Sequence, residues 1–142
     1  MSKIPKGLDI QTLAASDAPA FAALTFPVMR HLVETPPERD MVYVGAVSGD
    51  GTPVGLAFGM GGPDAIYELV SAYVGPFHRN VGIGTALINR LHDDFIERGY
   101  PTGAQIFTMD ADDQSYGRFL MRCGFAQPFI RQLVCKTTLD LA

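Results

Sequence analysis

The sequence predicts one mixed α/β domain with a strand–loop–helix unit at its centre. Short runs rich in β-branched and aromatic residues alternate with segments whose apolar residues recur at helical spacing. The 15 glycines and 10 prolines fall mainly between these segments, as expected for turns. With 142 residues, 47% of them hydrophobic and 18% charged, the chain is long enough and apolar enough to bury a single core.

The charge balance argues against nucleic acid as a partner. The 11 basic residues are outnumbered by 15 acidic ones, and no cluster of Lys and Arg forms the basic stripe that phosphates require. No apolar run approaches the roughly 20 residues needed to cross a bilayer. The first residues lack the apolar core of an export signal, and the two cysteines form no Cys-x-x-Cys pair. A cytoplasmic protein that does not enter a membrane is therefore expected.

The first half of the chain predicts a strand, two short helices and a hairpin. The segment Gly49-Asp50-Gly51 lies between two strand-like runs and is typical of a hairpin turn. Ser16 and Asp17 are expected to begin the first helix, because their side chains can accept bonds from its exposed amides. The expected elements are a strand over 8–13, helices from 16 and over 28–33, and strands over 41–48 and 54–60.

The second half begins with a strand over 66–74, which is aromatic and β-branched throughout. An irregular loop follows, and then an amphipathic helix whose apolar residues recur at helical spacing until Gly99 and Pro101 end it. The remaining expected elements are a strand over 104–109, a short helix from Asp113 to Gly124, and one or two strands within 125–138.

The loop before the amphipathic helix, Arg79-Asn80-Val81-Gly82-Ile83-Gly84-Thr85, is the sharpest chemical feature of the sequence. Glycines at a helix start leave amides uncovered, and the helix dipole favours an anion there, so the loop suits a phosphate. A turn that serves only the chain's own geometry explains the glycines equally well. No Gly-Lys-Ser/Thr follows, which excludes a Walker A loop, and Leu87 stands where a dinucleotide fingerprint needs glycine or alanine.

Two motifs together carry a resemblance to a known family. Arg79-x-x-Gly82-x-Gly84 follows the strand that ends at Val74, and the segment 119–125 reads as a helix ending in Gly-Phe. The first is similar to the acyl-CoA signature of the GNAT family of N-acetyltransferases, Q/R-x-x-G-x-G/A, and the second resembles a helix of that family. The resemblance implies one acyltransferase domain over 1–142. Its sheet would be mixed, mostly antiparallel and twisted, with strands 4 and 5 splayed apart and about four flanking helices.

The resemblance implies acetyl-CoA as co-substrate and no metal. His31, His78 and His92 are too scattered for a metal site and are expected to be solvated or capping residues. Asp113 stands where the family has an Asn that contacts pantetheine, but an Asp cannot donate as Asn does, and a helix cap is an equal interpretation. The residues carried over for CoA are the main chain of Ala72, Tyr73 and Val74 for pantetheine, Arg79 at the head of the signature, and the amides of Asn80, Val81, Gly82, Ile83, Gly84 and Thr85 for the pyrophosphate.

The implied activity is transfer of the acetyl group to a primary amine of a small molecule, amino acid or peptide, by direct attack in a ternary complex. Glu68 lies where some members carry their general base, and strand alternation would set it on the same face as Val70, Ala72 and Val74. An exposed Glu at a strand edge is an equal interpretation. An N–H near the splayed strands, such as that of Val74, is expected to polarise the thioester carbonyl.

The group that protonates the leaving thiolate is the main departure from the family. The usual tyrosine falls at Leu120 in this sequence, and Tyr116, one turn earlier on the same face, is the substitute. A core aromatic is the favoured interpretation of Tyr116, and Cys123 is expected to pack as a small hydrophobe. Leu120 also supports an alternative function, a non-catalytic acyl-CoA-binding or interaction module.

The acceptor would lie opposite the CoA, between the segments 31–40 and 125–133. Acidic residues of the first segment, among them Asp40, and Glu68 would favour a cationic amine, an effect that nearby arginines oppose. The chain is short for the two-strand ending of the family. This implies either an open acceptor site or one completed by the second subunit of a homodimer, and the sequence does not name the acceptor.

Overall fold

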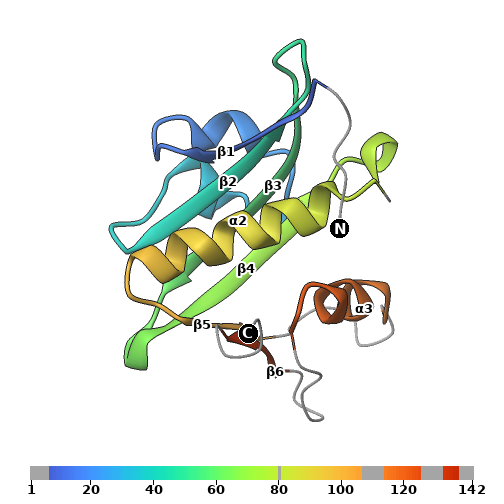
Figure 1. Ribbon diagram of the computed structural model, residues 1–142. Coiled ribbons are helices and arrows are strands. Elements are labelled where there is room, and N and C mark those ends of the chain that lie inside the picture. The colour runs from blue at the N-terminus through green and yellow to red at the C-terminus, as the bar shows by residue number, and fades with distance from the viewer. Residues whose placement is uncertain (1–6, 80, 107–113, 126–132, 138–142) are drawn as a thin grey trace.

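The computed structural model describes residues 7–79, 81–106, 114–125 and 133–137. Their strands form one sheet in the order β1-β2-β3-β4-β5-β6, antiparallel except for the parallel pair β4–β5 (Figure 1). This confirms the predicted mixed, mostly antiparallel sheet. The strands are β1 (Asp9–Leu13), β2 (Met41–Val47), β3 (Pro53–Gly61), β4 (Ile66–Val74), β5 (Thr102–Ile106) and β6 (Leu133–Thr137). The helices are α1 (His31–Glu34), α2 (Ile83–Glu97) and α3 (Gln114–Arg122), with 3-10 turns η1 (Ala18–Phe21), η2 (Pro27–Met29), η3 (Pro63–Ala65) and η4 (Pro76–His78).

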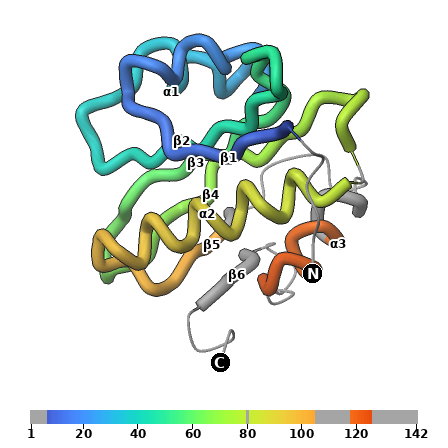
Figure 2. Tube along the Cα trace, turned by 45° about the horizontal axis from the view of Figure 1, so that its top comes forward, coloured from blue at the N-terminus to red at the C-terminus, as the bar shows by residue number. Residues whose placement is uncertain are grey.

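The sheet separates two layers. The long helix α2 covers one face, while η1, η2 and α1 cover the other (Figure 2). Buried side chains on the α2 side include Val42, Val44, Tyr67, Leu69, Leu87, Leu91, Phe95 and, from α3, Leu120. Those on the opposite side include Phe21, Val33, Tyr43, Leu56 and Phe58. The two clusters bury both faces of the central strands, which explains why β2 and β3 read as continuous apolar runs.

The two early helices are shorter than predicted. The helices expected from Ser16 and over 28–33 are replaced by η1, η2 and the four-residue α1. Asp17 makes no side-chain cap bond, so the expected start signal is unused. Pro27 lacks an N–H and holds Phe26 in extended backbone, with ψ 143°, which separates the two segments.

The hairpin between β2 and β3 forms as predicted. Gly51 has left-handed backbone, with φ +88°, and donates its N–H to the carbonyl of Ser48. Asp50 accepts bonds from the hydroxyl of Ser48 and from Thr52, and these bonds lower the pKa of Asp50 to about 2. The turn is therefore held by the residues that the pattern singled out.

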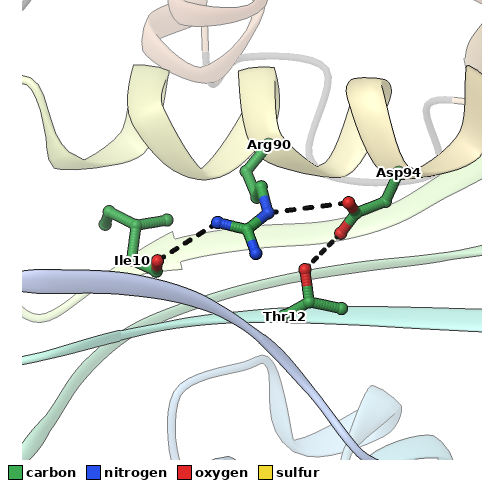
Figure 3. A network of polar contacts seen from close by, with 4 residues as sticks. All are labelled: Ile10, Thr12, Arg90 and Asp94. Atoms are coloured by element: carbon green, nitrogen blue, oxygen red, sulfur yellow. Dashed lines mark hydrogen bonds and ion pairs between the residues drawn. The ribbon is translucent and has the colours of Figure 1, made fainter.

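A polar network fastens α2 to β1 at the edge of the sheet (Figure 3). The hydroxyl of Thr12 donates to the carboxylate of Asp94, and Arg90 donates to the carbonyl of Ile10 at 3.3 Å. Arg90 and Asp94 also form an ion pair along the helix, with 3.5 Å between Nε and Oδ1. Because β1 contributes few buried residues, these bonds help to fix the edge strand to the helix.

His92 is buried, contrary to the expectation that it is solvated or caps a helix. Its Nδ1 shares a hydrogen bond of 2.7 Å with the hydroxyl of Tyr67 on β4. The ring of Tyr67 stacks on Phe95, with 4.1 Å between centroids, and its burial raises the pKa of Tyr67. His92 is therefore part of the packing between α2 and β4, whereas His31 is exposed and His78 is half-buried.

Candidate acyl-CoA site

β4 and β5 separate after Glu68, part-way along β4 (Figure 1). Their parallel pairing joins only residues 66–68 to residues 102–104. β4 then continues to Val74 beside β3, whereas β5 continues to Ile106 beside β6. Among the described residues, β4 beyond Glu68 therefore has a neighbouring strand on one side only. This open edge is the predicted splay of strands 4 and 5.

The register decides which main-chain groups face the open edge. The residue after Val74 donates its N–H to the carbonyl of Val54 at 2.8 Å, and Gly55 lies opposite Val74. This arrangement makes Val74 and Gly55 a non-hydrogen-bonded pair, so the N–H and C=O of Val74 point away from β3. By alternation the same holds for Ala72, while the main chain of Tyr73 points toward β3. Of the three residues expected to pair with pantetheine, Ala72 and Val74 present their main chain.

The start of α2 has the geometry that an anion site needs. Gly82 precedes the helix in left-handed backbone, with φ +89°, a conformation that favours glycine. The first helical bond runs from Ala86 to the carbonyl of Gly82, so the amides of residues 83–85 come before the helical ladder begins. No acidic residue lies in the first turn to compete with an anion. Asn80, also expected to contribute an amide, lies outside the described residues.

The open edge ends beside this helix start. A Cβ added at Gly84 would lie 3.7 Å from Cγ2 of Val74, so the last residue of β4 and the second glycine of the signature are neighbours. The same Cβ would lie 2.9 Å from two ring atoms of Phe119. Gly84 therefore makes room for α3 to pack, whereas the sequence suggested only that it lets a ligand approach.

The face on which Glu68 lies differs in part from the prediction. Two successive residues of β3 pair with residues of β4 that are two apart, so Val70 is left out as a β-bulge. The bulge breaks the alternation, and Ala72 and Val74 pack on the α2 side while Val70 packs on the opposite side. Glu68 stays on the side of Val70, because both of its chain neighbours face α2. It is half-buried and belongs to the last residue pair before β4 and β5 part.

Arg79 occupies the end of the open edge. Its Nε donates to the carbonyl of Val74 at 2.8 Å, and its guanidinium carbon lies 5.2 Å from the centre of the Tyr73 ring. The arginine is exposed, so the first residue of the signature is a solvent-accessible cation held against β4.

On the face of the sheet away from α2, the link between η1 and η2 is fastened to β4. Thr25 and Ser71 are both buried, and their hydroxyls share a hydrogen bond of 2.7 Å. The ring of Phe26 meets that of Tyr73 edge to face, with 6.4 Å between centroids. These contacts could not be predicted from local patterns, because they join residues far apart in the chain whose types are common in cores.

Residues 9–125 match the GNAT acetyltransferase family. The chain is a GNAT acetyltransferase. No curated protein sequence matches it significantly. The family match spans the open edge of β4, the start of α2 and the helix that ends in Gly-Phe, so it covers both motifs that carried the resemblance.

Solved structures share the fold of this GNAT acetyltransferase over nearly the whole chain. A GNAT-family acetyltransferase from Staphylococcus aureus Mu50 has a TM-score of 0.76 at 11% identity, covering 92% of this chain and 98% of that one. The PaiA N-acetyltransferase of Thermoplasma acidophilum, solved in complex with coenzyme A, has a TM-score of 0.68 at 14% identity, covering 92% and 98%. The ribosomal-protein-S18-alanine N-acetyltransferase of Escherichia coli has a TM-score of 0.68 at 17% identity, covering 90% and 89%.

In this GNAT acetyltransferase, the residue at the position where the family usually has a tyrosine is part of the core. Leu120 is fully buried, and Cys123 is buried with its Sγ 3.9 Å from the hydroxyl of Thr85, as a small packing residue would be. The main chain of Tyr116 lies in α3, but its side chain is outside the described part of the chain, as is all of Asp113.

The acidic residues expected beside the acceptor do not all remain available. Asp40 pairs with Arg98, and a hydrogen bond to Asp40 raises the pKa of Tyr100. This carboxylate is therefore engaged in joining β2 to the end of α2. Of the second expected wall, residues 126–132 lie outside the described residues. In the ranges that are described, no group of His, Cys, Asp and Glu side chains is arranged for a metal, and no helix is long and apolar enough to span a membrane.

Proposed function

We propose that the protein transfers an acetyl group from acetyl-CoA to a primary amine by direct attack in a ternary complex. The observation that carries this proposal is the open edge of β4, which ends beside the start of α2, where three amides precede the helical ladder. An extended arm with amides could bond along that edge while its phosphates meet the helix. Acetyl-CoA has these two parts in this order. The whole chain would form this one acyltransferase domain.

The residues present fit the co-substrate. The outward N–H and C=O of Ala72 and Val74 would bond the pantetheine arm, because they have no strand partner among the described residues. The amides from Gly82 to Thr85 would hold the pyrophosphate, with Asn80 and Val81 completing the loop. Acetyl-CoA supplies the activated acetyl group as a thioester. The chain holds the arm in place and provides the groups that move protons.

Glu68 is the proposed general base. It lies where β4 and β5 part, on the sheet face away from α2, so an acceptor entering from that face would meet the carboxylate beside the opening. The amine nitrogen forms a bond to the acetyl carbon and loses a proton to Glu68, directly or through water. The carbon–sulfur bond breaks, and CoA leaves as a thiolate that takes up a proton. We propose Tyr116 as its donor, since Leu120 has no proton to give.

The amide that polarises the thioester carbonyl should lie nearer to Glu68 than Val74 does. Six residue steps along the strand separate Glu68 from Val74, a distance of about 20 Å. An amine bonded to Glu68 cannot reach a carbonyl held there. We propose that the bulge at Val70, two residues from Glu68, supplies the polarising N–H in place of Val74.

The acceptor is proposed as a small amine, an amino acid or a peptide N-terminus. The structural relative from Escherichia coli is named for acetylating an alanine of ribosomal protein S18, which supports a peptide N-terminus as one member of this class. Glu68 would favour the positively charged form of an approaching amine by its field. A homodimer that completes the acceptor site is part of the same proposal, and a cytoplasmic location would give access to acetyl-CoA.

Release of thiol from acetyl-CoA in the presence of an amine panel tests the proposal. Wild-type protein should release CoA with at least one primary amine. Glu68→Gln should lower turnover by about 100-fold or more while acetyl-CoA affinity stays within about twofold. Glu97→Gln, an exposed glutamate at the end of α2, is the matched control and should behave as wild type. Equal turnover by wild type and Glu68→Gln would refute the role of Glu68, and binding without turnover across the panel would favour a non-catalytic acyl-CoA-binding module.

A further inference from the structure

We propose that Arg79 is an exchangeable cap on the open edge of β4: it holds the Val74 carbonyl before acyl-CoA binds and moves to the diphosphate when the pantetheine arm takes that carbonyl. The inference rests on the proposed function and adds a positioning role for one side chain. Its basis is that Arg79 donates to the carbonyl that the register turns toward the opening.

The open edge, which no second strand pairs with among the described residues, explains why a cap is needed. A strand edge with unpaired N–H and C=O groups is a template for pairing with another chain, and proteins commonly block it with a charged side chain. Arg79 blocks the last outward carbonyl of β4 through Nε at 2.8 Å. The same carbonyl is the natural acceptor for an amide of the pantetheine arm, so the arginine and the arm compete for one group.

The geometry also explains where the arginine goes. A guanidinium has five N–H donors, and the bond to Val74 uses only the one on Nε. Arg79 lies three residues before Gly82, and Val74 adjoins Gly84 at the start of α2. A short swing therefore brings the charged group beside an anion held by the helix amides. Bidentate bonds from arginine to phosphate oxygens are strong, whereas the bond to a neutral carbonyl is weaker, so the exchange favours the bound state.

The contacts of the Tyr73 ring would change during the exchange. The guanidinium lies over its ring, and the ring meets Phe26 in the link between η1 and η2. When Arg79 leaves, Tyr73 loses its cation while keeping its contact with Phe26. The tyrosine ring would thus report whether the arginine lies over it.

The test compares two ligands on two variants. Pantetheine consists of the arm without phosphates, whereas CoA contains the arm and the diphosphate. The cap should therefore affect the binding of the two ligands in opposite directions. Removing the side chain in Arg79→Ala should strengthen pantetheine binding about threefold, because no competitor remains, and weaken CoA binding about tenfold, because the phosphate partner is lost. Affinities would be measured by titration followed in ¹H–¹⁵N spectra, with the Tyr73 and Val74 amides as reporters.

The control is Arg90→Ala, which removes another exposed arginine that donates to a main-chain carbonyl, that of Ile10. It should leave both affinities unchanged. Arg79→Gln keeps a donor without charge and should weaken CoA while leaving pantetheine near its wild-type affinity. If Arg79→Ala fails to fold, Arg79→Met, which has no N–H to donate, serves in its place and should shift both affinities in the same directions.

The outcomes separate this inference from the proposed function. If wild-type protein binds neither CoA nor acetyl-CoA, the proposed function fails and the inference falls with it. If wild type binds CoA but Arg79→Ala leaves pantetheine affinity unchanged or lowers it, the exchange is wrong and the proposed function stands. Opposite shifts of the two ligands are the result that supports the exchangeable cap.

Discussion

The junction of β4 and β5 depends on a glycine, and replacing it tests how that junction is built. Gly103 lies opposite Tyr67 in the parallel pair. A Cβ added at Gly103 would lie 2.5 Å from Cε2 of Tyr67 and nearer still to the end of its ring. The ring cannot easily retreat, because it is buried, stacks on Phe95 and shares a hydrogen bond with His92.

The expected cost of Gly103→Ala follows from these contacts. Overpacking a close-packed core costs about 1–3 kcal/mol, and displacing the Tyr67 hydroxyl from its bond adds about 1 kcal/mol. We expect the free energy of unfolding to fall by about 3 kcal/mol, which corresponds to roughly 10 °C in Tm. Gly49→Ala is the control: its added Cβ would sit in the exposed hairpin, 3.4 Å from the carbonyl oxygen of Gly7, and should change stability by less than about 0.5 kcal/mol.

Urea unfolding followed by circular dichroism measures these changes. The variant Tyr67→Leu lacks the ring atoms that the new Cβ would meet, so it should relieve the overlap when combined with Gly103→Ala. We expect the double variant to be more stable than the sum of the single changes by about 2 kcal/mol. Single changes that add within about 0.5 kcal/mol would refute the steric account of the junction.

Two further predictions concern stability away from the junction. Tyr43→Phe removes the hydroxyl that donates to the carbonyl of Leu32 in α1 and should cost about 1 kcal/mol at neutral pH in urea unfolding. Because burial raises the pKa of Tyr43 to about 12, its stabilisation is complete below the usual value of about 10 and is lost as the pH rises through about 12. A stability curve of the same shape for the Phe variant would contradict this. Thr12→Val should cost about 1 kcal/mol in wild type but nothing further after Asp94→Ala, which removes the acceptor of the Thr12 hydroxyl; additive costs would show that the hydroxyl acts elsewhere.

Local patterns were sufficient for most of the sheet. β2, β3, β4 and their hairpin followed from β-branched runs and from the Gly49-Asp50-Gly51 turn, since both signals depend on neighbouring residues. The prediction of the two early helices failed because Pro27 and the extended Phe26 divide a segment whose apolar residues recur as in a helix. Packing of that segment on Tyr43 and Phe58 holds it in place without a full helix.

The candidate site was predictable where it depends on one segment and not where it depends on register. The glycine at residue 82 and the loop around it were evident, because left-handed backbone and a helix start leave a sequence signature. The bulge at Val70 was not, since it exists only relative to β3, and it reversed the face of Ala72 and Val74. The contact of Arg79 with Val74 likewise arises from the turn between them, which the sequence alone does not shape.

Calorimetric titration with acetyl-CoA tests most directly the central claim, that the open edge of β4 and the start of α2 form an acyl-CoA site. Wild-type protein should bind acetyl-CoA and CoA at micromolar concentrations and should not bind NADH. Gly82→Glu should abolish binding, because it sets a carboxylate and backbone strain where the pyrophosphate would lie. Gly49→Glu adds the same charge in the hairpin and should bind as wild type. Failure of the wild-type protein to bind either acetyl-CoA or CoA would mean that the loop before α2 serves only as a turn.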